Sequence, residues 1–214
     1  MEISHHERVE DGATLPLVVW TADTPRRTLS SAVLGGGADE AAWILNATVR
    51  RGYDRSDPAE HLAALALELG LSGRGVGMMT AVDVNDLVMQ TDGGVVAWAT
   101  VGVETAQWAA APSPDWHEPP SRVGTINILV DLPVVLSPAA MVNAVATATE
   151  AKAQAMFERG LAGTGTPTDA TCICSPVDGP VEDYAGPRSI WGARVARSVH
   201  AAVARGLAAG GDRT

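Results

Sequence analysis

The sequence predicts an α+β fold, in which one domain combines a mixed or mostly antiparallel sheet with two to three helices. Three observations support this prediction. The length of 214 residues is typical of a single domain. Short apolar runs bounded by glycine-rich turns recur along the chain, as is typical of strands. Two longer stretches begin with Asp-Pro or Ser-Pro and continue in the 3.6-residue apolar period of a helix.

The strands are expected where apolar and β-branched residues cluster, at residues 9–21, 28–34, 43–49, 76–84, 95–103, 124–135 and 168–177. Gly35, Gly36 and Gly37 follow the second of these strands and predict a turn that no side chain obstructs. The segment Asp92-Gly93-Gly94 predicts a hairpin turn between strands 76–84 and 95–103.

The helices are marked by their first residues. Asp57 and Pro58 predict a helix over 57–70, with Asp57 as the cap and Gly70 at the end. Ser137 is the expected cap of a second, longer helix over 137–160. The last helix is expected over 188–207.

The remaining segments fit one domain over 1–214. Residues 109–122 are rich in Pro, Ala, Ser and Trp and predict a surface loop within it. The tail after the last helix, residues 210–214, is expected to fray.

Composition excludes several classes of protein. The net charge of −10 argues against a nucleic acid as partner. The apolar stretches are broken well before the length of a membrane span, and the charged N-terminus is unlike a signal peptide, so we expect a cytoplasmic protein. Cys172 and Cys174 are expected to be buried, inert thiols. The five histidines form no ligand pair at helical spacing, so no metal site is expected.

Lys152 is the single lysine among 15 basic residues. On the helix 137–160 it lies on a mostly apolar stripe, where a charged group needs a partner. The alternative is that its alkyl stem follows the surface and the ammonium reaches water. Glu150, two residues earlier, points about 200° away on a straight helix. Both side chains can serve one pocket only where the helix bends or is covered on two sides.

Two Gly-Thr pairs lie at the mouths of strands. Gly124 and Thr125 begin one strand, and Gly165 and Thr166 precede another. Further polar groups follow them at Asn127, Thr168 and Asp169. Such turns present backbone N–H groups that can bind an oxyanion. Turns in which Thr and Asp cap their own backbone explain the same residues.

The order of six motifs is more specific than any one of them. They are SSAVLGGG at 30–37, ILNATV at 44–49, VGMMTAVD at 76–83, GTINI at 124–128, TATEAK at 147–152 and GTPTDA at 165–170. In this order the chain, from about residue 28 to 207, resembles the adenosylcobinamide amidohydrolase family of vitamin B12 (cobalamin) salvage.

The resemblance implies a reaction and a partner. It implies hydrolysis of the amide that joins aminopropanol to a propionate of the corrin ring, with adenosylcobyric acid and aminopropanol as products. The partner is then a small corrinoid, and no separate cofactor is implied because the substrate carries the cobalt. The sequence leaves open whether the chain forms a homo-oligomer through its Ala-rich helix.

Amide hydrolysis needs a nucleophile, oxyanion stabilisation and a proton for the departing amine. In one hypothesis Glu150 activates water and returns the proton, while Lys152 or the Gly-Thr amides stabilise the oxyanion. Asn127 and Asp169 then orient the reacting groups. The competing hypothesis makes Thr125 or Thr168 a covalent nucleophile. The expected substrate-binding residues come from the motifs: Gly36, Gly37, Met79, Thr80, Asp83, Gly124, Thr125, Gly165, Thr166 and Thr168.

Two other functions stay open at this point. One is a non-catalytic corrinoid-binding protein, a carrier or sensor on the same scaffold. The other is an amidase or acyltransferase that acts on a different amide.

Overall fold

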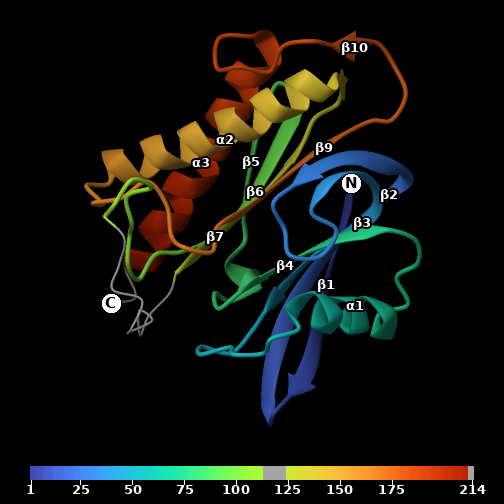
Figure 1. The fold of residues 1–214 in the computed structure, drawn as a ribbon, viewed down its shortest axis with the longest axis vertical. Coiled ribbons are helices and arrows are strands. Elements are labelled where there is room, and N and C mark those ends of the chain that lie inside the picture. The colour runs from blue at the N-terminus through green and yellow to red at the C-terminus, as the bar shows by residue number, and fades with distance from the viewer. Residues whose placement is uncertain (113–123, 212–214) are drawn as a thin grey trace.

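A computed structural model describes residues 1–112 and 124–211, and one eight-stranded sheet organises them (Figure 1). Its strands are β1 Glu2–Glu10, β2 Ala13–Ser30, β3 Gly37–Thr48, β4 Gly75–Thr80, β5 Val88–Asp92, β6 Val95–Gly102, β7 Thr125–Asp131 and β9 Ala170–Ser175. A separate two-stranded sheet joins β8 Val135–Leu136 and β10 Val181–Glu182. The helices are α1 Pro58–Glu68, α2 Pro138–Glu158 and α3 Ile190–Gly211, with a 3₁₀ turn η1 at Val84–Asp86.

The sheet is mixed and mostly antiparallel. Its order is β4-β3-β2-β9-β7-β6-β5, and β1 pairs with the first part of β2. Within this large sheet the pairs β3–β4 and β7–β9 are parallel, and the others are antiparallel. The predicted α+β class with a mostly antiparallel sheet and three helices is therefore confirmed.

Three hydrophobic cores define the layers. One core lies between α2, α3 and the strands β6, β7 and β9. A second lies between α1 and the strands β2 and β3. The third is lined by residues of both halves of the sheet, and its Trp20 and Trp98 meet edge to face with ring centroids 5.9 Å apart. The sheet thus curls so that its two halves face each other, with helices on both outer sides (Figure 1).

The curl depends on β2, which covers most of the predicted strand 9–21 and the first residues of the predicted strand 28–34. An irregularity in its pairing with β3 falls between Thr21 and Arg26. The first part of β2 pairs with β1, and residues 27–30 pair with β9. The prediction of two strands was therefore wrong, because one bent strand serves both halves. The charged residues 2–10 also form a strand, which gave no apolar signal because most of its side chains are exposed.

The predicted hairpin between strands 76–84 and 95–103 was also wrong. The turn at Gly93 and Gly94 joins β5 to β6, while β4 pairs in parallel with β3. The strand 76–84 ends at Thr80, and Asp83 accepts a hydrogen bond from the Asn85 backbone N–H at 2.9 Å to begin η1. That turn redirects the chain, so β5 is a separate strand.

The helices follow the predicted starts. Ser137 accepts a hydrogen bond from the Ala140 backbone N–H at 3.2 Å and caps α2. Asp57 precedes α1 but makes no cap hydrogen bond, because its carboxylate binds Arg55 instead. α3 continues to Gly211, beyond the expected end at 207. Within the predicted loop 109–122, residues 109–112 are exposed, while 113–122 and the end of the tail lie outside the described residues.

The part of the chain that the structure describes contains neither a membrane-spanning helix nor a metal-binding cluster of side chains. None of its helices is both long enough and apolar enough to cross a membrane. No group of three or more His, Cys, Asp or Glu side chains comes together there in a way that would hold a metal ion.

Cys172 and Cys174 are fully buried on β9, with their sulfur atoms 3.8 Å apart. The hydrogen bond between the thiols and the burial of Cys174 hold its pKa well above the usual value. Since the thiolate is the reactive form, we expect neither cysteine to be alkylated in the native protein at neutral pH. Counting labelled thiols by mass spectrometry before and after denaturation checks this; rapid labelling of native protein would contradict the burial.

Candidate active site

A buried ion pair lies at the start of β9. The Lys152 ammonium, from the C-terminal half of α2, contacts Asp169 Oδ2 at 2.5 Å. The two side chains are 10% and 13% exposed, so the pair is largely removed from water. Lys152 therefore does not extend along the surface, which was the alternative left open by its sequence position.

Four donor groups lie within hydrogen-bonding distance of the Asp169 carboxylate. Besides Lys152, its donors are the backbone N–H groups of Ile126 at 2.9 Å and Thr166 at 3.0 Å, and the Thr166 hydroxyl at 2.5 Å. Donors on both of its oxygens hold the Asp169 carboxylate in a fixed orientation. Asp169 thus ties the 165–169 turn to β7 and holds the Lys152 ammonium beside both.

The Lys152 ammonium has more N–H groups than it has acceptors among the described residues. It carries three hydrogens, and among the described residues Asp169 is its one hydrogen-bond acceptor. The Cα of Gly165 is its close neighbour, since a Cβ built there would lie 2.6 Å from Lys152 Nζ and 2.5 Å from Asp169 Oδ2. The absence of a side chain at Gly165 is what allows this pair to form.

Three threonine hydroxyls gather beside the ion pair. Thr125 Oγ1 and Thr168 Oγ1 are 2.7 Å apart. Thr168 donates to the Gly124 carbonyl oxygen at 3.1 Å, and Thr166 lies 2.6 Å from the same oxygen. Thr166 has one hydrogen for two acceptors, Gly124 O and Asp169 Oδ1, so it serves one of them at a time.

A second polar network lies deeper, between the two halves of the sheet. Asn127 Nδ2 donates to Asn46 Oδ1 at 2.9 Å and to the Met79 carbonyl oxygen at 3.0 Å. Asn46 Nδ2 in turn donates to Thr100 Oγ1 at 3.1 Å. Asn46, Thr100 and Asn127 are all buried. The Asn127 Oδ1 atom is buried too and has no hydrogen-bond partner among the described residues.

The topology explains why these residues meet. β7 and β9 are parallel neighbours, so Thr125 and Asp169 lie at the same edge of the sheet. Gly102, at the end of β6, pairs with Thr125. Gly124 has to be small as well, because a Cβ there would lie 2.3 Å from the Gly102 carbonyl oxygen. α2 packs across this half of the sheet and brings Lys152 to the same edge.

The structure brings together most of the predicted site residues. Lys152, Asp169, Gly165, Thr166, Gly124, Thr125 and Thr168 form one cluster, which we call the Lys152 cluster, and Asn127 and the Met79 carbonyl belong to the deeper network.

Other predicted residues have local roles. The Thr80 hydroxyl accepts from the Val82 backbone N–H, and Asp83 begins η1. Gly36 packs closely against the preceding turn, since a Cβ built there would lie 2.4 Å from the Ala32 carbonyl oxygen. Gly37 adopts a φ of 92°. Their loop lies beside β4 through the Leu34–Gly77 bridge.

Glu150 is separated from the Lys152 cluster. α2 is one continuous helix from Pro138 to Glu158, and Glu150 is exposed while Lys152 is buried. The two side chains therefore point in different directions, as a straight helix requires.

Glu150→Gln is expected to leave the amide hydrolysis that the family resemblance implies within about threefold of the wild type, because an exposed surface substitution seldom perturbs a buried site. The measurement is the steady-state rate of the purified variant. A loss of a hundredfold or more would return the general-base role to Glu150.

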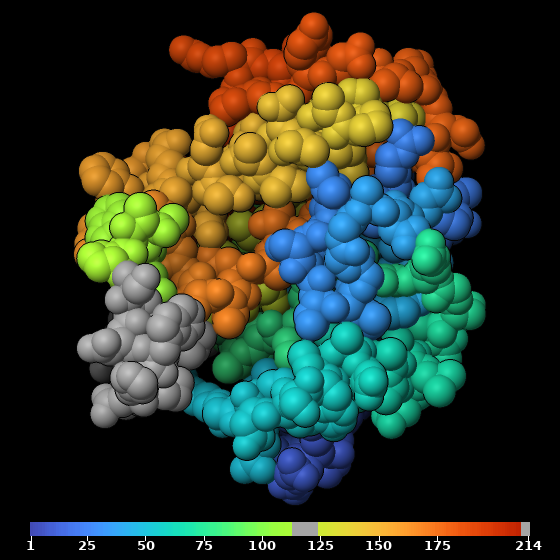
Figure 2. Space-filling model, viewed as in Figure 1, coloured from blue at the N-terminus to red at the C-terminus, as the bar shows by residue number. Residues whose placement is uncertain are grey.

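The surface beside the loop that precedes β9 is hollowed. In Figure 2 a hollow lies between the blue segment that follows β2, the orange loop before β9 and the cyan chain after β3. The segment after β2 is joined to the start of β9, because the Ser31 N–H donates to the Thr171 carbonyl and the Ser31 hydroxyl accepts from the Thr171 N–H, both at 3.0 Å.

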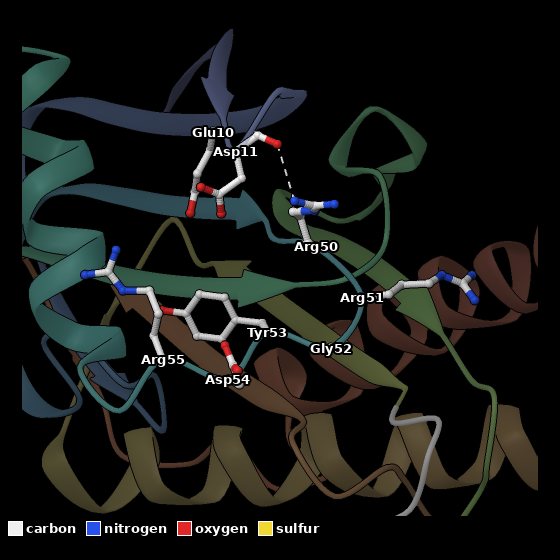
Figure 3. A pocket seen from close by; sticks show the side chains of 8 residues that line it. All are labelled: Glu10, Asp11, Arg50, Arg51, Gly52, Tyr53, Asp54 and Arg55. Carbon is white, nitrogen blue, oxygen red and sulfur yellow. Dashed lines mark hydrogen bonds between the residues drawn. The ribbon is translucent and has the colours of Figure 1, made fainter.

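A separate pocket lies between the β1–β2 turn and the chain after β3 (Figure 3). Its side chains carry both charges, including Glu10, Asp54, Arg50 and Arg55, and Arg50 donates to the Asp11 carbonyl oxygen at 3.4 Å. None of the predicted site residues lines this pocket. Several of its charged side chains pair with residues outside the pocket, since Glu10 contacts Arg8, Arg51 contacts Glu104 and Arg55 contacts Asp57. The Lys152 cluster, which holds most of the predicted site residues, is the better candidate for chemistry.

Asn46 and Thr100 were missed as site residues by sequence reasoning. Asn46 lies within the motif ILNATV, where an asparagine on a strand of otherwise apolar inward positions was the available signal. Thr100 carries no comparable signal, because threonine is common in strands. Its part in the network follows from its pairing with Asn127 across β6 and β7.

The α+β fold and its buried Lys–Asp pair beside threonine hydroxyls define an enzyme-like site of the kind that can stabilise an oxyanion. Residues 1–214 match the family model described as adenosylcobinamide amidohydrolase. The chain is also 30% identical over 189 residues to the adenosylcobinamide amidohydrolase of Methanosarcina mazei, which covers 84% of this chain and 89% of that relative. The chain belongs to the adenosylcobinamide amidohydrolase family, and it is a hydrolase that acts on an amide bond.

Proposed function

We propose that this protein hydrolyses the amide between aminopropanol and the corrin propionate of adenosylcobinamide, giving adenosylcobyric acid and aminopropanol. The observation that carries the proposal is the buried Lys152–Asp169 pair beside the threonine hydroxyls, in a chain that belongs to this family. The cobalt belongs to the corrinoid substrate, and we propose that the reaction needs no further cofactor.

Lys152 is the proposed oxyanion donor. When a nucleophile attacks the amide carbon, the carbonyl oxygen becomes negative and needs donors fixed in place beforehand. The ammonium is held by Asp169 and has N–H groups without a further acceptor among residues 1–112 and 124–211. Because the site is shielded from water, its positive charge acts more strongly than it would in solution.

The threonine mechanism is favoured over water activation by Glu150. Glu150 is exposed and on another face of α2, whereas Thr125 and Thr168 contact each other beside the ion pair. In this mechanism one hydroxyl oxygen attacks the amide carbon and its proton moves through the other hydroxyl to the departing nitrogen. Aminopropanol leaves, and water then hydrolyses the threonine ester and restores the hydroxyl.

Incubation of the purified protein with adenosylcobinamide, followed by mass spectrometry, tests the function. We expect adenosylcobyric acid and aminopropanol in equal amounts. A protein that binds the corrinoid and becomes coloured without releasing aminopropanol would be a carrier or sensor instead. Hydrolysis of other amides but not of this one would indicate a different amidase.

A substrate that is slow to deacylate tests the mechanism. We expect an ester on one peptide that contains Thr125 or Thr168, located by peptide mass spectrometry. Incorporation of ¹⁸O from water into the acid, with no protein ester at any time, would favour direct attack by water.

A further inference from the structure

The unpartnered Asn127 Oδ1 atom is the strongest unexplained polar feature of the described residues. Buried acceptors are normally hydrogen-bonded, and one that lacks a partner is costly. Asn127 is 2% exposed, and its amide nitrogen already donates to two acceptors. Its oxygen therefore needs a donor from outside the described protein.

The orientation of Asn127 is determined by its neighbours. The Met79 carbonyl oxygen can only accept, so the Asn127 nitrogen faces it and the oxygen faces away. Asn46 turns its own oxygen to the same nitrogen, because its nitrogen donates to Thr100 Oγ1. Asn46 and Thr100 are thus positioning residues that hold Asn127 Oδ1 in one direction.

The position of Asn127 relates this acceptor to the Lys152 cluster. Thr125 and Asn127 are two residues apart on β7, so their side chains leave the same face of the strand, about 7 Å apart. Lys152 reaches the same edge from α2, on the helical side of the sheet. The site therefore offers free donors from one side and a free acceptor from the other.

This arrangement matches a secondary amide. A trans amide directs its C=O and its N–H in opposite directions. The C=O needs a donor, which Lys152 has free, and the N–H needs an acceptor, which Asn127 has free.

We propose that Asn127 Oδ1 accepts the N–H of the scissile amide and that Asn46 and Thr100 orient it for this contact. The inference rests on the proposed function and adds a specificity to it. The enzyme selects an amide over the corresponding ester, because an ester has no N–H and would leave the acceptor unpaired. Because the N–H of the substrate amide points to Asn127, the lone pair that develops on this nitrogen points away from Asn127, toward the threonine hydroxyl that supplies the proton.

The test compares adenosylcobinamide with its ester analogue, in which oxygen replaces the amide NH. For the wild type we expect the KM of the ester to be at least tenfold higher than that of the amide. For Asn127→Ala we expect kcat/KM on the amide to fall by ten- to a hundredfold and on the ester by less than threefold. Asn46→Ala is expected to shift the amide-to-ester ratio in the same direction.

Ser198→Ala is the matched control, since Ser198 is a buried hydroxyl on α3 that donates to the Val195 carbonyl. It should leave the ratio unchanged. Equal losses on both substrates in Asn127→Ala would show a structural role and overturn the inference alone. Equal KM values for the amide and the ester in the wild type would also overturn this inference. So would a structure of the substrate complex in which a water molecule is still hydrogen-bonded to Asn127 Oδ1. Failure of the wild type to release aminopropanol would overturn the proposed function and this inference with it.

Discussion

Lys152→Met is expected to lower amide hydrolysis by about a hundred- to a thousandfold, the effect of removing one preorganised oxyanion donor. Methionine has a similar length and no charge, so it fills the space without supplying the N–H groups. The loss should lie in kcat more than in KM, because the oxyanion forms only in the transition state. The measurement is steady-state turnover with adenosylcobinamide.

The same variant should also destabilise the fold. Removing one partner of a buried ion pair typically costs about 3–5 kcal/mol, and the three donors that Asp169 keeps should hold the cost near the lower end. Arg197→Met is the matched control. It also breaks an ion pair, but the Arg197 side chain that contacts Asp92 is largely exposed. It should leave both turnover and the unfolding midpoint nearly unchanged. Turnover by Lys152→Met close to that of the wild type would remove Lys152 from the mechanism.

Gly165→Ala is expected to reduce turnover strongly while leaving the protein folded. The new Cβ would lie 2.5 Å from Asp169 Oδ2 and 2.6 Å from Lys152 Nζ, distances that real Cβ atoms do not adopt. Both neighbours are ends of side chains, so they can move apart without disrupting the backbone. The pair would separate, and the ammonium would leave the position that the oxyanion requires, with a loss of tenfold or more.

Gly186→Ala provides the comparison, because no atom lies within 4 Å of the Cβ built there. Turnover and thermal unfolding of both variants separate the effects. If Gly165→Ala retained full turnover, the Lys152–Asp169 contact would be irrelevant to catalysis. If it unfolded instead, the glycine would serve the fold rather than the site.

Local sequence patterns predicted the helices better than the pairing of the strands. Ser137 and the apolar period after it predicted α2 nearly to its ends, because capping and amphipathicity are local properties. Strand pairing was less accessible. The turn at Gly93 was placed correctly, but its first strand was assigned to β4, since a turn does not say which earlier strand it follows.

The candidate site also contains residues that local motifs indicated and residues that only the tertiary structure relates to one another. The Gly-Thr motifs and Lys152 stood out in the sequence, and most of them meet in one cluster. Glu150 stood out equally, and its exposure on α2 separates it from them. Asn46 and Thr100 were not selected, because their importance lies in a hydrogen-bond network across three strands.

The sequence by itself determined the α+β class, the helix starts, the family resemblance and the candidates for chemistry, because these depend on residue types and their spacing along the chain. Only the tertiary structure decided that Lys152 is buried against Asp169, that Glu150 lies on another face of α2, and that Asn127 Oδ1 has no partner in the part of the chain that the structure describes. The contact between Ile126 and Asp169 depends on the parallel pairing of β7 with β9, and the contact between Asn46 and Asn127 depends on the curl of the sheet at the bend in β2. These contacts join residues 43 and 81 positions apart in the sequence, which no local pattern relates.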